Sequence, residues 1–236
     1  MVVGSNPTRS IFTIKSYYHR KAAYVLLNFS SLCIDTIRHQ EQLAKMVTTA
    51  DTPGLEIKRV CGVDVSYKNN MAYCSASVID KDSLNVIDSV NTRGIVYHPY
   101  IPGLFTLREY EPIMNTLKLL NTEFQVLFID GHGRLHPRRC GLASHIGVMI
   151  DRPTVGIAKS LICGFVREDQ FIEFDGEILG FQIGTDRKRQ IYVSIGHRIS
   201  LGSAIKVTKE LTKSHQWLPE PLRVAHVNSK NQANFV

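Results

Sequence analysis

Residues 59–94, RVCGVDVSYKNNMAYCSASVIDKDSLNVIDSVNTRG, decide the fold of this chain. They contain three β-rich runs separated by short polar turns: Arg59–Tyr67, Met71–Asp80 and Leu84–Gly94. Strands joined by connections this short pair in an antiparallel way. The stretch therefore predicts an antiparallel meander.

The rest of the chain alternates helical and strand-like patterns. Val126–Asp130 is almost wholly apolar and ends on a carboxylate, which is typical of a buried parallel strand. Periodicity and turn residues predict the other elements: an amphipathic helix at Leu32–Val47, a helix near Thr106–Leu120, a helix at Gly141–Ile150, a strand at Thr154–Lys159, a hairpin near Glu177–Gly196 and a closing helix at Ser200–Ser214.

This order of elements predicts an α/β fold. A meander that leads into βαβ units, with Asp64 on the first strand and Asp130 at the end of the fourth, outlines a ribonuclease H-like domain. We expect a central mixed sheet, made of the antiparallel meander plus parallel strands and flanked by helices.

Composition points to a globular protein that binds nucleic acid. The chain has 236 residues, enough for one sizeable core, and 28 Lys and Arg against 21 Asp and Glu. A basic surface attracts phosphate backbones. The five cysteines include no Cys-x-x-Cys pair, which argues against a zinc knuckle or disulfide framework and favours a cytoplasmic location. No apolar run is long enough to span a bilayer, so we expect no membrane partner. The sequence shows no heptad pattern, so we expect a monomer.

Three carboxylates are candidate metal ligands. Asp64 and Asp130 stand where burial is expected, and a buried carboxylate needs a basic partner, a raised pKa or a divalent cation. Glu109, early in the predicted helix, offers a third. Oxygen donors of this kind suit Mg²⁺ or Mn²⁺, which leave positions for a phosphate oxygen and a water. Each residue also has an alternative role. Asp64 or Asp130 could form a salt bridge or cap a turn, and Glu109 could be a solvated glutamate on a helix.

Basic residues follow two of the predicted strands. Lys159 could stabilise charge on a phosphate or orient an attacking water, or it could be a solvent-facing strand end. The loop after the apolar strand could bind phosphate through its backbone amides and cations, or its side chains could be surface groups. These side chains are His132, His136, Arg138 and Arg139.

Tyr100 lies between prolines in the run HPYIPG, residues 98–103. The proline rings hold the loop rigid, so it could act as a wedge that replaces a base in a stack. Cutting beside a damaged base often requires pulling that base out of the helix. The alternative is a packed loop that covers the sheet edge.

Three long segments together resemble the endonuclease V family: HPYIPGLFTLRE at 98–109, IDGHGRLHPRRCGLASH at 129–145 and PTVGIAK at 153–159. The similarity continues in VSIGHRIS at 193–200 and LPEPLRVAH at 218–226. The resemblance implies a ribonuclease H-like fold and metal-dependent hydrolysis of the second phosphodiester bond 3′ to deoxyinosine. The products have a 3′-hydroxyl and a 5′-phosphate, and several members also cut RNA at inosine.

The resemblance also implies roles for residues. It identifies Asp64, Glu109, Asp130 and His226 as ligands of Mg²⁺, for which Mn²⁺ can substitute, and Lys159 as the active-site lysine. Backbone donors near Gly131 should bind the hypoxanthine carbonyl and reject adenine. The expected contacts to nucleic acid and lesion are Pro99, Tyr100, Ile101, Pro102, Gly103, Phe105, Gly131, His132, Gly133, His136, Arg138 and Leu142.

We expect residues 26–236 to form a single endonuclease V-like catalytic domain. Residues 1–25 match nothing in the family and are expected to be a disordered extension or the result of a start codon assigned too early. Three other functions remain open: an endoribonuclease specific for inosine, another ribonuclease H-like nuclease, and an inosine binder that does not cleave. The wedge motif argues against the second and the complete set of acidic residues and Lys159 against the third.

Overall fold

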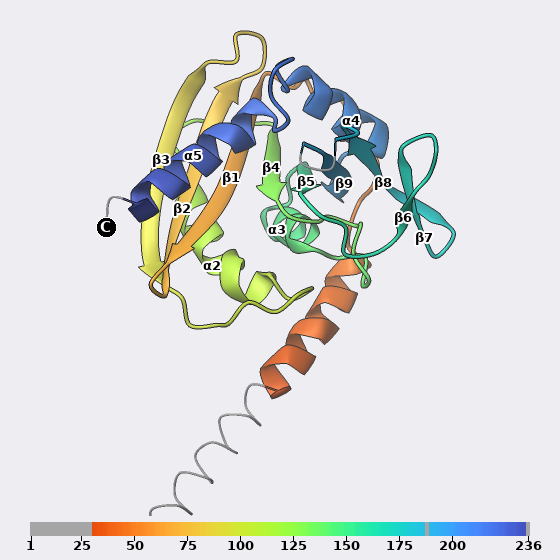
Figure 1. Cartoon of the computed structure of the whole chain (residues 1–236), viewed down its shortest axis with the longest axis horizontal. Coiled ribbons are helices and arrows are strands. Elements are labelled where there is room, and N and C mark those ends of the chain that lie inside the picture. The colour runs from red at the N-terminus through yellow and green to blue at the C-terminus, as the bar shows by residue number, and fades with distance from the viewer. Residues whose placement is uncertain (1–29, 187–188, 235–236) are drawn as a thin grey trace, which may run out of the picture. The chain divides into compact units, whose positions relative to one another are not determined.

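The computed structural model describes residues 30–186 and 189–234 (Figure 1). The chain divides into two compact units, residues 1–38 and 39–236. In the first unit, residues 30–38 are helical. The second unit begins with helical residues 39–44 and contains the sheet and the candidate site. The expected extension, residues 1–25, lies outside the described residues.

The second unit is built on one nine-stranded sheet of order β3-β2-β1-β4-β5-β9-β8-β7-β6. Its strands are β1 Arg59–Lys68, β2 Met71–Asp80, β3 Val86–Ile95, β4 Val126–Asp130, β5 Thr154–Ala158, β6 Phe165–Val166, β7 Phe171–Phe174, β8 Glu177–Ile183 and β9 Ile191–His197. The pairs β1–β4 and β4–β5 are parallel, and the other pairs are antiparallel. The predicted α/β fold is confirmed.

The meander forms because its turns carry the required residues. Lys68 pairs with Met71, so Asn69 and Asn70 form a two-residue turn, with φ of 50° and 59°. Asparagine tolerates this left-handed conformation, which matches the twist of a hairpin. The third strand begins at Val86 rather than at Leu84 as predicted, because Leu84 has a φ of 56° and belongs to the turn.

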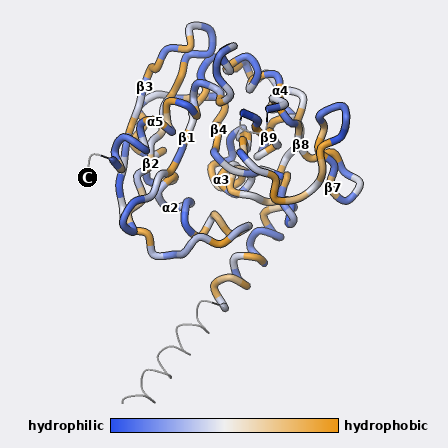
Figure 2. Tube along the Cα trace, viewed as in Figure 1, coloured by the Kyte–Doolittle hydropathy of each residue, from blue (hydrophilic) through white to orange (hydrophobic). Residues whose placement is uncertain are grey.

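Helices cover both faces of the sheet. The pairs α2 (Thr106–Leu117) and α3 (Leu142–Ile150), and α4 (Leu201–Glu210) and α5 (Glu220–Asn234), pack on opposite faces. Side chains alternate across a strand, so Val60 joins the core under α4 and α5 while Cys61 joins the core under α2 and α3. Figure 2 shows that hydrophobic residues gather on β4 and α3.

The helix predicted at Ser200–Ser214 is present as α4 but ends earlier, at Glu210. It is not the closing helix, because α5 closes the described part of the chain. The buried stripe of α5 consists partly of small residues, Ala225, Ser229 and Ala233, which leave no strong apolar periodicity to recognise. The short hairpin of β6 and β7 was also not predicted.

None of the helices within the described residues has both the length and the apolar character that a membrane span needs.

Candidate active site

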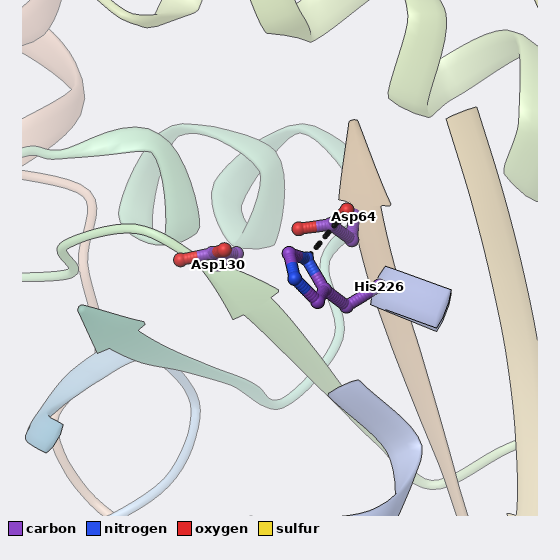
Figure 3. A group of neighbouring side chains, drawn as sticks. All are labelled: Asp64, Asp130 and His226. Atoms are coloured by element: carbon purple, nitrogen blue, oxygen red, sulfur yellow. Dashed lines mark ion pairs between the residues drawn. The ribbon is translucent and has the colours of Figure 1, made fainter. Parts of the chain in front are cut away.

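Asp64 and Asp130 lie side by side because β1 and β4 run parallel. The last partners in the register are Val63 and Ile129, so the next residue of each strand is an aspartate. Asp64 is buried, and Asp130 is partly buried at the end of β4. With His226 they form a group whose ligand atoms all lie within 4.8 Å of one another (Figure 3).

His226 reaches this group because α5 packs closely on β1. A Cβ atom on Gly62 would lie 2.2 Å from the backbone carbonyl carbon of Pro221, so only glycine allows this approach. The ring of His226 then points towards Asp64, with 3.4 Å between Nδ1 and Oδ2 (Figure 3). His226, expected as a metal ligand from the family resemblance, is thus brought to the carboxylates by a helix that was not predicted.

Glu109 enters from α2, on the other side of the strand ends. It lines a cavity of about 120 Å³ together with Asp64 and Asp130. The hydroxyl of Tyr67 donates to Oε1 of Glu109 at 3.3 Å, and the guanidinium of Arg108 lies 3.8 Å from the centre of the Tyr67 ring. The three predicted carboxylates therefore border one small cavity.

Lys159 follows β5, directly beside β4. Its Nζ donates to Oδ2 of Asp130 at 2.5 Å. The parallel pairing of β4 with β5 places the two strand ends together. Lys159 thus joins the acidic group, although it lies one residue beyond the strand that was expected to end on it.

The carboxylates differ in their protonation. Burial, together with the charges of Asp130 and Asp64, raises the pKa of Glu109 to about 8. Burial also raises the pKa of Asp130, although the Lys159 ammonium opposes this. Burial would raise the pKa of Asp64 as well, but contacts with His226 and Ser229 outweigh it and hold the pKa below its ordinary value. Burial is the largest single cause for all three carboxylates, and neighbouring negative charge adds to it at Glu109 and Asp130.

These residues fit a divalent cation. Carboxylate oxygens are the preferred ligands of Mg²⁺ and Mn²⁺, and a neutral imidazole nitrogen is a common metal ligand that can complete such a site. Nδ1 of His226 is buried and has no hydrogen-bond partner among the described residues. A cation between the side chains would offset both the burial and the mutual repulsion that raise the pKa of Glu109.

A second cavity, of about 300 Å³, adjoins the acidic group, and Asp130 and Lys159 form part of its wall. Eight of the residues expected to contact the lesion line it: Tyr100, Pro102, Gly103, Phe105, Gly131, His132, His136 and Leu142. Segments that are distant in the sequence therefore form one pocket.

Four expected lesion contacts do not line this pocket: Pro99, Ile101, Gly133 and Arg138. Gly133 is instead a packing position, because a Cβ atom there would lie 2.0 Å from the carbonyl oxygen of Ile195.

Six lining residues were not predicted: Gln40, Gly141, Ala158, Ser160, Leu161 and Ile162. Ala158 and Ser160–Ile162 flank Lys159, so their position in the sequence could have indicated that they line the pocket. Nothing near Gln40 in the sequence indicates that Gln40 lines it.

The tip of the expected wedge is accessible. Tyr100 is 60% exposed, and its ring centroid lies 4.9 Å from that of Phe105. Phe105 lines both cavities. An exposed aromatic ring therefore stands at the rim of the larger pocket, next to the acidic group.

Comparisons with known proteins agree with this arrangement. The endonuclease V family pattern matches residues 41–227. Endonuclease V of Thermofilum pendens is 41% identical over 195 residues, which cover 80% of this chain and 84% of that protein. The crystal structure of endonuclease V from Bacillus subtilis has a TM-score of 0.78 and 31% identity, covering 85% of this chain and 92% of that one.

A third relative was solved with nucleic acid. Endonuclease V of Ciona intestinalis, in complex with a 24mer DNA containing an inosine followed by a ribo-adenosine, has a TM-score of 0.77 and 27% identity. The match covers 87% of this chain and 99% of that one. With the family pattern matched over most of the sequence, this chain belongs to the endonuclease V family of nucleases.

Proposed function

We propose that this protein is a metal-dependent endonuclease that recognises deoxyinosine in DNA during repair of deaminated bases. It hydrolyses the second phosphodiester bond on the 3′ side and leaves a 3′-hydroxyl and a 5′-phosphate. One observation carries the proposal: the pocket of about 300 Å³ and the acidic group share Asp130 and lie beside Lys159. A displaced base and a nearby phosphate can therefore be held at the same time.

The larger pocket receives the displaced hypoxanthine. Its wall combines the aromatic and apolar residues Phe105, Leu142 and Ile162 with glycine backbone, which suits a flat base. Tyr100, exposed at the rim, takes the space that the base leaves in the stack.

Hypoxanthine carries a carbonyl at the position where adenine carries an amino group. A pocket that selects hypoxanthine therefore needs a hydrogen-bond donor facing this position. Gly131 does not supply one, because its N–H already donates to the carbonyl of Ile157 at 3.2 Å. Leu142 is the better candidate, since it is the first residue of α3 and lines the pocket. Its N–H has no acceptor among the described residues, as is usual in the first turn of a helix. Adenine would leave this donor unpaired.

Asp64, Glu109, Asp130 and His226 would hold Mg²⁺, with Mn²⁺ able to substitute. When bound, the cation polarises the scissile phosphate and lowers the pKa of a coordinated water. Lys159 contributes a positive charge at the edge of the group, where it can contact the phosphate as negative charge builds up.

We further propose that the enzyme acts as a monomer in the cytoplasm. The five cysteines are all free, as a reducing compartment requires. Inosine-containing RNA is a second candidate substrate. The Ciona intestinalis relative was solved with a ribo-adenosine next to the inosine, which supports tolerance of a 2′-hydroxyl near the lesion.

The test uses end-labelled DNA duplexes and matching RNA, each with one inosine or none, in Mg²⁺ or EDTA. We expect Mg²⁺-dependent cleavage one nucleotide beyond inosine by the wild type, and none by Asp64→Ala. Asp82→Ala, in an exposed turn, is the matched control and should cleave normally. Binding to inosine without cleavage, or cleavage independent of inosine, would contradict the proposal. The ratio of DNA to RNA rates identifies the preferred substrate.

A further inference from the structure

The carbonyl oxygen of Gly103 accepts hydrogen bonds from three side chains. Nη2 of Arg138 lies 2.7 Å from it, Nε2 of Gln40 lies 3.1 Å from it, and Nε2 of His136 lies 3.2 Å from it. A carbonyl oxygen has two lone pairs, so it is fully engaged by these donors. The orientation of the peptide group after Gly103 is thereby fixed.

The donors are also connected to one another. Nε of Arg138 donates to Oε1 of Gln40 at 2.7 Å, and the backbone N–H of Arg138 donates to Nδ1 of His136 at 3.2 Å. Since Nδ1 accepts, the proton of the neutral ring is on Nε2, which can donate to Gly103. We call Gln40, Gly103, His136 and Arg138 the Gly103 clamp.

The clamp acts on the loop that forms one wall of the pocket. Gly103 has a φ of 78°, and the N–H of Leu104 donates to the carbonyl of Ile101 at 2.9 Å, which closes a tight turn. Loop residues that line the pocket are Tyr100, Pro102, Gly103 and Phe105. A change in the peptide orientation at Gly103 would therefore move the wall that faces the base.

Gln40 is the least expected member of the clamp. It comes 63 residues before Gly103, is 1% exposed and lines the pocket itself. A buried amide is tolerated when both its oxygen and its nitrogen are bonded, and both are bonded here. Gln42, two residues further on, is exposed and provides a matched control.

We propose that Gln40 and Arg138 are positioning residues that hold the loop at Gly103 and thereby determine the preference for inosine, an inference that rests on the proposed function. The sequence suggested that Arg138 binds phosphate. In the structure its guanidinium donates to Gly103 and Gln40. Its role is therefore to shape the pocket.

Equilibrium binding of DNA duplexes in EDTA distinguishes a residue that shapes the pocket from one that binds phosphate. The variants are Gln40→Leu, Arg138→Gln and the control Gln42→Leu, with duplexes that carry one inosine or one adenosine, over a range of salt concentrations. We expect the first two variants to lose about tenfold of the inosine preference, as removal of one or two buried hydrogen bonds predicts. The slope of log affinity against log salt should equal that of the wild type.

A phosphate contact by Arg138 would instead reduce that slope by about one and preserve the preference. Either that result or a uniform loss of affinity with unchanged preference would overturn the proposal. If Gln40→Leu does not fold, Arg138→Lys takes its place, because it keeps the charge but loses the fork that reaches both acceptors. It should show the same loss of preference.

Hydrogen exchange tests the clamp without nucleic acid. The amide of Leu104 should exchange several-fold faster in Gln40→Leu than in the wild type or in Gln42→Leu, while the amide of Ile129 in β4 reports that the fold is intact. Unchanged exchange at Leu104 would overturn the clamp. A wild type without inosine preference would contradict the proposed function, and the exchange data would still decide whether the clamp holds the loop.

Discussion

Oγ of Ser229, on α5, donates a hydrogen bond to Oδ2 of Asp64, on β1, at 2.5 Å. The hydroxyl of Ser66 lies 2.8 Å from that of Ser229. A hydroxyl has one proton, so Ser229 accepts from Ser66 when it donates to Asp64. This chain of hydrogen bonds joins the helix that carries His226 to the strand that carries Asp64, within the proposed metal site.

Ser229→Ala should weaken Mn²⁺ binding about five- to tenfold, because it removes a bond that orients a ligand and is worth roughly 1 kcal/mol. Titration calorimetry or electron paramagnetic resonance of Mn²⁺ measures the change. Ser214→Ala, at an exposed serine beyond α4, is the control and should bind as the wild type does. Equal affinity of the alanine variant and the wild type would show that Ser229 does not orient Asp64.

Tyr67→Phe should lower kcat several-fold without changing KM. It removes only the hydroxyl that donates to Glu109, while the ring remains to contact Arg108. One lost hydrogen bond of about 1 kcal/mol corresponds to this factor. Steady-state kinetics on an inosine duplex gives both constants. Tyr97→Phe, at a side chain that is 76% exposed, is the control and should leave both unchanged.

Gly62→Ala should destabilise the fold by about 1–3 kcal/mol and weaken Mn²⁺ binding as well. The added methyl group would clash with the backbone of Pro221 and displace α5. Urea denaturation measures the free energy of unfolding. Gly94→Ala is the matched strand control, since a Cβ atom there has no neighbour within 4 Å. A similar loss in both variants would contradict the role of Gly62 in seating α5.

His145 should contribute to loss of stability in acid. Burial, with the neighbouring charge of His39, lowers the pKa of His145 from 6.5 to about 4. Between these two pH values the unfolded chain binds more protons than the folded chain, so stability falls as the pH falls through this window. A shift of this size corresponds to at most about 3 kcal/mol.

Urea denaturation at pH 7 and pH 4.5 tests this. The wild type should lose more free energy of unfolding over that interval than His145→Gln does. The exposed His215 provides the control, because His215→Gln should show the same pH dependence as the wild type. Equal losses in the wild type and His145→Gln would mean that His145 titrates alike in both states.

Much of the fold follows from local signals. The meander is specified by alternating strands and by Asn69 and Asn70, which fit a two-residue turn without help from elsewhere. β4 is apolar from Val126 to Ile129 because both of its faces are covered, so the parallel strand was predicted correctly. Such signals depend only on residues close in sequence.

The family resemblance also indicates Asp64, Asp130, Glu109 and Lys159 from the sequence alone. Their proximity, however, comes from the parallel pairing of β1 with β4 and of β4 with β5. Glu109, Asp130 and Lys159 could be named because each lies in a long distinctive segment, whereas Asp64 was indicated by its place on the first strand of the meander and by the resemblance. The sequence could not show the burial and the mutual repulsion that together raise the pKa of Glu109.

Only the tertiary structure decided what α5 and Gln40 do. The stripe by which α5 packs on β1 includes small residues, which produce no apolar periodicity, so neither the helix nor the position of Ser229 could be predicted. Gln40 meets Gly103 across 63 residues through hydrogen bonds. A hydrogen bond between distant residues leaves no spacing in the sequence, because it depends on how separately formed elements pack together.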